Sequence, residues 1–142
     1  MRSRPTGIRP TAIAAATAAL AAAVLTGTAL APSAAAAGGY PTCNTFKNVG
    51  GHKVPAYGQP TPSLTCNLVL NDTHSNVAVE VLQQSLNACY PFDLDDDGYY
   101  GPKTFLAVKS VQDGAGISDD GLYGPDTRDA MKHWGLSGCG KI

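Results

Sequence analysis

The residue types that perform most enzyme chemistry are few in this chain and stand apart from one another. His52, His74 and His133 lack the short paired spacing of zinc peptidases, and we expect all three at the surface. No serine has a lysine three residues later, so a Ser-x-x-Lys acyl enzyme is excluded. A glycosidase needs two opposed carboxylates, but Glu80, the only glutamate, lies off an apolar stripe and is expected on a solvated face. The sequence therefore predicts no catalytic site.

Acidic residues at alternate positions resemble the first half of a calcium-binding loop. Asp93, Asp95 and Asp97 have the spacing, but the twelfth position should be a bidentate glutamate and is Thr104. We therefore expect a solvated loop in which Asp97 forms a turn, and we predict neither a metal nor a cofactor. Calcium binding is the alternative, because three close carboxylates repel one another and a cation would relieve that repulsion.

The first 37 residues have the order of an export signal. Arg2, Arg4 and Arg9 precede an uncharged, alanine-rich run over residues 11–30, and small residues follow. This order predicts a secretory signal peptide over residues 1–37, cleaved after Ala37, and hence a secreted protein with no membrane attachment. A membrane anchor is the alternative, since the run approaches the ~20 residues that a spanning helix needs.

The four cysteines, Cys43, Cys66, Cys89 and Cys139, all follow the predicted cleavage site. An even number of cysteines in an exported chain indicates two disulfides. Of the three possible pairings we favour Cys43–Cys66 and Cys89–Cys139, because the first pair brackets one local segment and the second brackets the rest. Each closure would contribute roughly 3–4 kcal/mol. A metal site or a nucleophilic cysteine is the alternative, although no Cys-x-x-Cys spacing is present.

Length and charge limit the functions that the chain can have. The mature part of about 105 residues has the size of one domain and is too short for an eight-stranded α/β barrel of ~250 residues. Removal of the signal takes away three of the ten basic residues and none of the eleven acidic ones. The resulting net negative charge disfavours nucleic acid as a partner.

An internal repeat relates residues 97–109 to residues 120–132 at an offset of 23 positions. Eight of the thirteen aligned positions are identical, which is far above chance. In each copy an Asp-Gly pair predicts a tight turn with glycine at positive φ. Pro102 and Pro125 then predict the first positions of two helices.

Apolar residues at helical spacing predict three helices with one buried face each. The three stripes are Val79, Leu82, Leu86 and Cys89, then Thr104, Ala107, Val108 and Val111, then Thr127, Ala130, Met131 and Trp134. Ser75 or Asn76 is the expected N-cap of the first helix, and Gly50-Gly51 predicts a β-hairpin before it. We therefore predict an all-α fold, a small three-helix bundle over residues 75–142 with two similar Asp-Gly turn and helix repeats. A short disulfide-stapled hairpin segment over residues 38–74 precedes it as a cap.

The motifs over residues 76–134 resemble the peptidoglycan-binding domain family, of the three-helix type associated with cell-wall hydrolases. The residues that carry the resemblance are Val79, Leu82, Gln83 and Leu86 in the first helix, Asp97, Gly98, Tyr100, Gly101, Pro102 and Thr104 in the first repeat, Gln112, and Asp120, Gly121, Tyr123, Gly124, Pro125 and Thr127 in the second repeat. We expect these residues to form the fold, with Gln83 and Gln112 bonded to loop backbone. The segment that bears the first cysteines and the helix end at Asn87–Tyr90 resemble secreted actinobacterial members.

The candidates for ligand contact are Tyr90, Tyr99, Phe105, Leu106 and Asp97. Phe105 and Leu106 are apolar where the third helix has Arg128 and Asp129 instead. They either line a wall-binding groove or lie beneath the N-terminal cap. We expect Tyr100, Tyr123 and Trp134 to lie in the core.

The resemblance implies a secreted, non-catalytic bacterial module that binds peptidoglycan as a monomer, either by its stem peptide or by its glycan. A separate wall hydrolase is a candidate second partner, since no hydrolase domain is attached here. Two alternatives stay open. One is an exported two-disulfide protease inhibitor that uses the Pro-rich segment 55–63 beside Cys66, and the other is a wall hydrolase with an unrecognised site.

Overall fold

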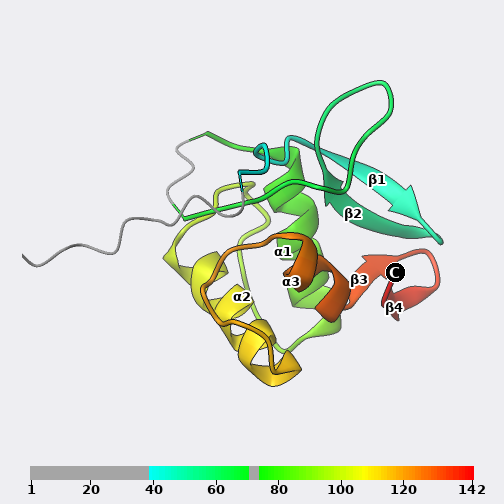
Figure 1. Ribbon diagram of the computed structural model, residues 1–142. Coiled ribbons are helices and arrows are strands. Elements are labelled where there is room, and N and C mark those ends of the chain that lie inside the picture. The colour runs from blue at the N-terminus through cyan, green and yellow to red at the C-terminus, as the bar shows by residue number, and fades with distance from the viewer. Residues whose placement is uncertain (1–38, 71–73) are drawn as a thin grey trace, which may run out of the picture. The chain divides into compact units, whose positions relative to one another are not determined.

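The computed structural model describes residues 39–70 and 74–142, so the predicted signal peptide lies outside the described residues. The elements in chain order are β1 (Thr45–Val49), β2 (His52–Ala56), α1 (Val77–Cys89), α2 (Pro102–Ala115), α3 (Pro125–Ala130), β3 (His133–Gly135) and β4 (Gly138–Gly140). The strands form one four-stranded sheet in the order β1-β2-β3-β4, with every neighbouring pair antiparallel (Figure 1). Within the described ranges, no helix has the length and apolarity that crossing a membrane requires.

The predicted all-α fold is wrong, because the C-terminal residues form strands. The third helix ends at Ala130 after six residues, and Met131 already has an extended backbone. Glycines disfavour helix in the segment that follows. One of them, Gly135, lies opposite His52 of β2, where an added Cβ would overlap the carbonyl oxygen of Gly51. The last two strands thereby extend the N-terminal hairpin, and the fold is a mixed one of helices and a sheet.

The N-terminal hairpin forms where the sequence predicts it. Gly50 and Gly51 take positive φ values of 57° and 88°, and β1 pairs with β2 from Val49↔His52 onward. Beyond the hairpin, the backbone of Leu68 exchanges two hydrogen bonds with that of Tyr123, at 2.8 and 3.0 Å. The N-terminal segment is therefore bonded directly to the second repeat.

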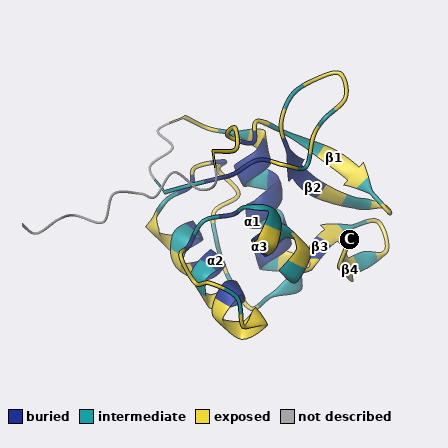
Figure 2. Ribbon diagram, in the orientation of Figure 1, coloured by how far each residue is buried: buried dark blue, intermediate teal, exposed yellow. Residues whose placement is uncertain are grey.

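Helix α1 is the centre of the core. It contacts all four strands and α2, and Figure 2 shows it buried along most of its length. Tyr100 and Tyr123 are buried in the same core, as the sequence predicts. Trp134 is 44% exposed, so its predicted place in the core is wrong. The reason is that it lies on a strand, where it no longer follows the helical stripe.

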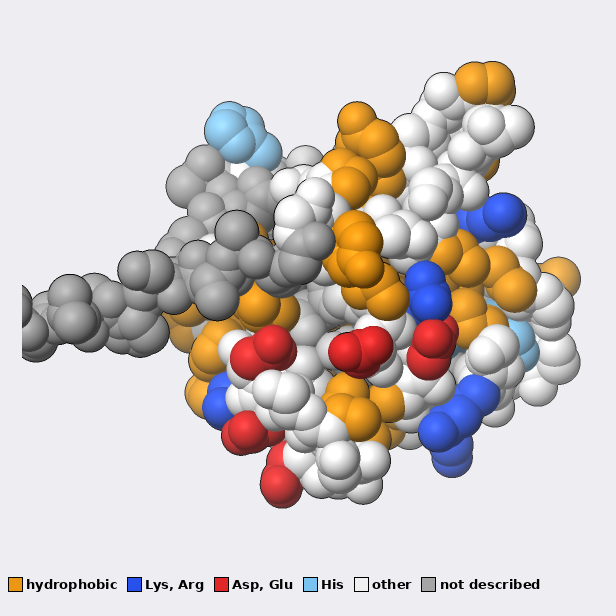
Figure 3. All heavy atoms as spheres, viewed as in Figure 1, with side chains coloured by type: hydrophobic (Ala, Val, Ile, Leu, Met, Phe, Trp, Pro, Cys, Tyr) orange, Lys and Arg blue, Asp and Glu red, His pale blue; other side chains and the backbone are white. Residues whose placement is uncertain are grey.

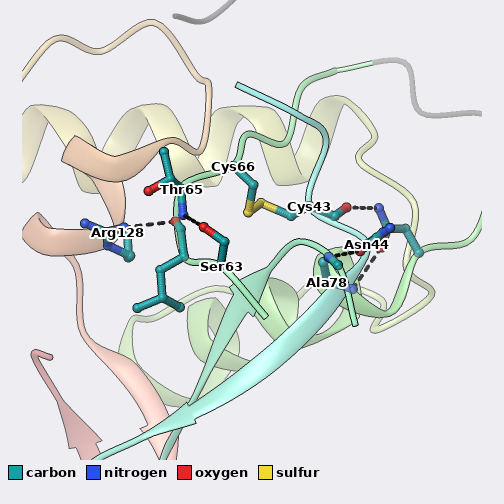
Figure 4. The surroundings of a disulfide bond; sticks show 10 residues. Cys43, Asn44, Ser63, Thr65, Cys66, Ala78 and Arg128 are labelled. Atoms are coloured by element: carbon teal, nitrogen blue, oxygen red, sulfur yellow. Dashed lines mark hydrogen bonds between the residues drawn. A yellow bond between two sulfur atoms is a disulfide. The ribbon is translucent and has the colours of Figure 1, made fainter. Parts of the chain in front are cut away.

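Both disulfides join the pairs favoured by the sequence, Cys43–Cys66 and Cys89–Cys139. Around the first of them, three segments meet (Figure 4). The side chain of Asn76, the N-cap of α1, accepts from the amide of Ala78 and donates to the carbonyl of Cys43. The guanidinium of Arg128 donates to the carbonyl of Leu64 at 2.9 Å. These bonds connect α1 and α3 to the N-terminal segment.

Candidate ligand-binding clefts

Each Asp-Gly turn is held by one buried glutamine from the helix before it. In the first repeat, Nε2 of Gln83 donates to Oδ1 of Asp97 at 2.9 Å and to the carbonyl of Tyr99 at 3.1 Å. Its Oε1 accepts from the amide of Gly98 at 2.9 Å. Nε2 also lies 3.2 Å from the hydroxyl of Thr104. A single side chain therefore bonds Asp97, Gly98 and Tyr99 of the turn.

The second repeat has the same arrangement. Nε2 of Gln112 donates to Oδ1 of Asp120 and to the carbonyl of Leu122, both at 2.9 Å. Oε1 accepts from the amide of Gly121 at 2.8 Å, and Nε2 lies 2.9 Å from the hydroxyl of Thr127. Both turn glycines have positive φ, 76° for Gly98 and 73° for Gly121. The predicted bonds of the two glutamines and the predicted turns are confirmed.

The turn aspartates are themselves bonded to backbone. Oδ1 of Asp97 accepts from the amide of Tyr99, and Oδ1 of Asp120 accepts from the amide of Leu122, each at 2.9 Å. The amide of Tyr99, followed by the side chain of Gln83, lowers the pKa of Asp97. The second oxygen of each carboxylate makes no hydrogen bond to the turn backbone. Each turn therefore presents a negatively charged group.

The two tyrosines at matching positions of the repeats differ in their hydrogen-bond partners. The hydroxyl of Tyr100 donates to the carbonyl of Gly121 at 2.8 Å and so ties the first repeat to the second. The hydroxyl of Tyr123 is buried and has no hydrogen-bond partner in the structure. Burial raises the pKa of both phenols well above the usual value. Both tyrosines are packing residues that a ligand does not reach.

Beside each turn lies a cleft, and the two clefts are equivalent by the repeat. The first, of about 260 Å³, is lined by Gln83, Leu94, Asp95, Asp97, Tyr99, Gly101, Pro102, Lys103 and Thr104. The second, of about 330 Å³, is lined by Gln112, Ile117, Ser118, Asp120, Leu122, Gly124, Pro125, Asp126 and Thr127, with Tyr40 and Asn67 added. Apart from the glutamines, every residue of the first cleft has its counterpart 23 positions later in the second.

The clefts differ in charge and in their walls. The first contains Lys103, whose Nζ lies 4.0 Å from Asp95 in an exposed pair. The second has Asp126 at the position of Lys103, and none of its lining residues is basic. Tyr40 and Asn67 come from the N-terminal segment and give the second cleft an additional wall. The second cleft is therefore the larger and the more acidic of the two.

The structure separates the five predicted ligand residues. Asp97 and Tyr99 line the first cleft. Tyr90 lies at the end of α1, where its hydroxyl accepts from the amide of Lys132 at 2.7 Å. Phe105 is half-buried with its ring against Gly121, so it supports the second turn. Leu106 is 62% exposed and lines neither cleft.

Sequence reasoning missed several residues of the second cleft. Ile117 and Leu122 are the counterparts of Leu94 and Tyr99, so the 23-residue offset was a signal that points to them. Tyr40 carries no such signal, because it reaches the cleft from a segment outside the repeat. The pairing of the N-terminal segment with the second turn is what brings it there.

The sequence predicts all three histidines at the surface. For His133 this prediction is wrong, because its side chain is fully buried. One ring nitrogen, Nε2, lies 2.9 Å from the carbonyl of Arg128, and Nδ1 has no hydrogen-bond partner in the structure. Burial is the main cause that lowers the pKa of His133, and the neighbouring His52 lowers it further. The strand that replaces the end of the third helix turns this side chain inward.

Among residues 39–70 and 74–142, no group of three or more His, Cys, Asp or Glu side chains is placed to hold a metal ion. Asp97, the last acid of the calcium-like pattern, is engaged by the turn amide of Tyr99 and by Gln83. The acids of that loop are thus used for the turn or exposed to solvent.

Comparison with known proteins identifies the segment that carries both clefts. No curated protein and no solved structure matches the chain. Residues 75–131 match the model of a family described as a putative peptidoglycan binding domain. This match contains both Asp-Gly turns, both glutamines and nearly all of the lining residues of the clefts. Residues 75–131 of the chain are therefore similar to the putative peptidoglycan-binding domain family.

Proposed function

We propose that this protein is an exported, non-catalytic module that binds peptidoglycan through the clefts beside its two Asp-Gly turns. The observation that carries the proposal is the equivalence of the two clefts within the segment that matches the family. The glutamine network holds each turn without help from a ligand, so the clefts are formed before binding. A preformed site avoids much of the entropic cost of ordering its own side chains.

The second cleft is the principal site in this proposal. Asp120 and Asp126 supply negative charge, while Ile117 and Leu122 supply an apolar wall. An amine beside a small aliphatic side chain matches this lining, and a peptidoglycan stem peptide with a diamino residue offers both. In the first cleft, Lys103 adds a positive charge that suits a carboxylate of the ligand. We therefore assign the stem peptide, rather than the glycan, to the clefts.

Location and organisation complete the proposal. Two disulfides are typical of an oxidising compartment, and the predicted signal peptide would direct the chain there. A segment similar to peptidoglycan-binding domains supports a working location outside the cell or in the cell wall. We propose residues 38–74 as a cap that adds a wall to the second cleft, and residues 75–142 as the main binding part. The protein would act as a monomer, with a separate wall hydrolase as a candidate partner.

Co-sedimentation with purified peptidoglycan sacculi tests this function. The protein should pellet with sacculi at physiological salt, and a soluble stem peptide should compete for binding. Failure to pellet would exclude the function. Release of dye from labelled sacculi would instead reveal a hydrolase, and it would contradict the non-catalytic role.

Protease inhibition is a second candidate, because one observation favours it. Segment 57–63 is an exposed loop closed by reciprocal backbone bonds between Tyr57 and Ser63, at 2.8 and 2.9 Å. It is anchored by the bond from the amide of Gly58 to Asn44, and it lies near the disulfide at Cys66. Rigid loops beside disulfides suit inhibition, so the protein should be assayed against serine proteases. Absence of inhibition at micromolar protein would remove this candidate.

A further inference from the structure

The sheet carries a hollow that the proposed function does not use. It has a volume of about 620 Å³ and is lined by Asn48, Gly51, Lys53, Trp134, Gly135 and Leu136. None of these residues lines either cleft. Trp134 is 44% exposed and Leu136 is fully exposed, although both are large apolar side chains. An exposed tryptophan in a hollow is a feature that binding sites share.

The backbone beneath Trp134 is fixed by contacts with α1. Its amide donates to the hydroxyl of Ser85 at 3.1 Å. Directly opposite it in the sheet is Cys139, which is disulfide-bonded to Cys89 at the end of α1. The backbone that carries the ring therefore has a fixed support at the surface, which favours a preorganised contact.

The charge of this region is opposite to that of the clefts. Segments 45–56 and 131–142, which form the sheet, contain Lys47, Lys53, Lys132 and Lys141 and no acidic residue. All eleven acidic residues lie between positions 72 and 129. On the face seen in Figure 3 the acidic side chains gather over α2 and α3, and most basic side chains lie toward the sheet. A ligand of the hollow should therefore be anionic.

We propose that the hollow binds a carboxylate-bearing glycan, namely sugars without an attached stem peptide in the same polymer whose stem peptides occupy the clefts. The face of an indole ring packs against the C–H face of a pyranose, which is apolar and of similar width. Asn48 supplies an amide for sugar hydroxyls, and Lys53 supplies an ammonium group for a carboxylate. This inference rests on the proposed function, because it names a second part of the same polymer.

A second copy of the chain fits the hollow less well. Two exposed apolar side chains cover much less than the ~800 Å² per partner of a stable protein interface. A two-fold contact at this surface would also bring the lysines of both copies together, which is unfavourable. The hollow offers one aromatic face with hydrogen-bonding groups beside it, and this combination matches a sugar.

Trp134 is the only tryptophan of the chain, so its fluorescence reports directly on the hollow. The purified protein is titrated with glycan strands that have been freed of stem peptides and retain their lactyl carboxylates. We expect a saturable change in tryptophan emission, weakened about tenfold in Lys53→Gln because a charge-assisted contact is lost. Tyr57→Ala, which removes an exposed aromatic ring outside the hollow, should leave the titration unchanged.

The result that overturns the inference is an unchanged emission at glycan concentrations where the protein pellets with sacculi. Trp134→Ala removes a half-buried ring and can weaken the fold. The titration of the unmodified protein is therefore the measurement that decides between binding and no binding. Neutral N-acetylglucosamine oligomers should bind more weakly than the anionic strands, and equal affinity would contradict the role of Lys53. Failure to pellet with sacculi is a different outcome, which removes the proposed function as well.

Discussion

At the scale of single residues, the buried glutamines determine the shape of the clefts. Gln83 and Gln112 each satisfy a turn amide, a turn carbonyl and the carboxylate of an aspartate. No other side-chain type supplies both a donor and an acceptor at that length without charge. This chemistry explains why a glutamine occurs before each turn. It also makes the two glutamines the polar positions of the repeats where substitution should reduce stability most.

Replacing Gln112 by leucine should destabilise the protein by about 2–3 kcal/mol, because the buried amide of Gly121 loses its partner and the carbonyl of Leu122 keeps only the hydroxyl of Thr127. Urea unfolding followed by circular dichroism measures the difference. Gln84→Leu is the matched control, since Gln84 bonds only Glu80 on the same helix. Equal stability of the two variants would show that the network is not what holds the turn.

Acidification should destabilise the protein through His133. Burial lowers the pKa of this histidine in the folded state, so below about pH 6.5 the unfolded chain binds a proton that the folded chain does not. Stability should therefore fall as the pH decreases below that value. Burial is the dominant cause. The backbone carbonyl of Arg128 and the carboxylate of Asp129 favour protonation, whereas His52 and the charge of Arg128 oppose it. In His133→Gln the histidine contribution should vanish, and an unchanged pH profile of the free energy of unfolding would contradict this account.

The sequence predicts the residues of the repeats well, because each of them is fixed by its neighbours along the chain. The turn glycines, the helix-starting prolines and the glutamine bonds all follow from local patterns. His133 and Trp134 were misplaced because their positions depend on a strand pairing with residues about 80 positions earlier. Local periodicity contains no information on that pairing.

At the scale of elements, the first turn and the start of α1 fit together closely. The carbonyl oxygen of Gly98 accepts a hydrogen bond from the amide of Asn76 at 3.0 Å. The hydroxyl of Ser75 donates to the carbonyl of Asp97. The same contact therefore positions both the turn beside the first cleft and the N-cap of α1. A change at this contact should affect both elements together.

Gly98→Ala should destabilise the protein by about 2 kcal/mol or more, because φ is +76° and an added Cβ would lie 2.9 Å from the backbone nitrogen of Asn76. Gly114→Ala, in α2 with open space around it, should instead stabilise by about 0.5–1 kcal/mol. Thermal unfolding of both variants checks the opposite signs. A neutral Gly98→Ala would mean that the turn can move away from α1.

The third helix shows where element prediction fails. The stripe from Thr127 to Trp134 has helical spacing, yet only residues up to Ala130 are helical. The β2 edge needs a partner, and Gly135 allows close approach to it. Tertiary pairing therefore outweighs the local spacing. The same cause explains why the second hairpin was not predicted.

At the scale of the whole molecule, the disulfide Cys89–Cys139 attaches the C-terminal hairpin to α1. It closes a loop of 50 residues, so replacing both cysteines by alanine should cost about 4 kcal/mol. The loss should appear as a lower urea midpoint of unfolding. The corresponding loss for Cys43–Cys66, whose separation is 23 residues, should be slightly smaller, at about 3.5 kcal/mol. A variant without Cys89–Cys139 that unfolds at the original midpoint would show that the hairpin is held by packing alone.

Charge is also organised over the whole molecule. All eleven acidic residues lie between positions 72 and 129, and the only charged residues of the sheet segments are lysines. The family match covers the repeats but not the sheet, whose strands all lie outside residues 75–131. The stem-peptide site and the glycan site are therefore assigned to two different parts of one compact unit.

The central claim is that the second cleft binds the stem peptide of peptidoglycan. The most direct measurement is the equilibrium affinity of Asp120→Asn/Asp126→Asn for purified sacculi, compared with the unmodified protein. Asparagine keeps an acceptor for the turn amide and removes the charge, so folding should be preserved and affinity should fall about tenfold or more. Asp113→Asn, on α2 outside both clefts, should bind as the unmodified protein does. Equal affinity of all three proteins would contradict the account.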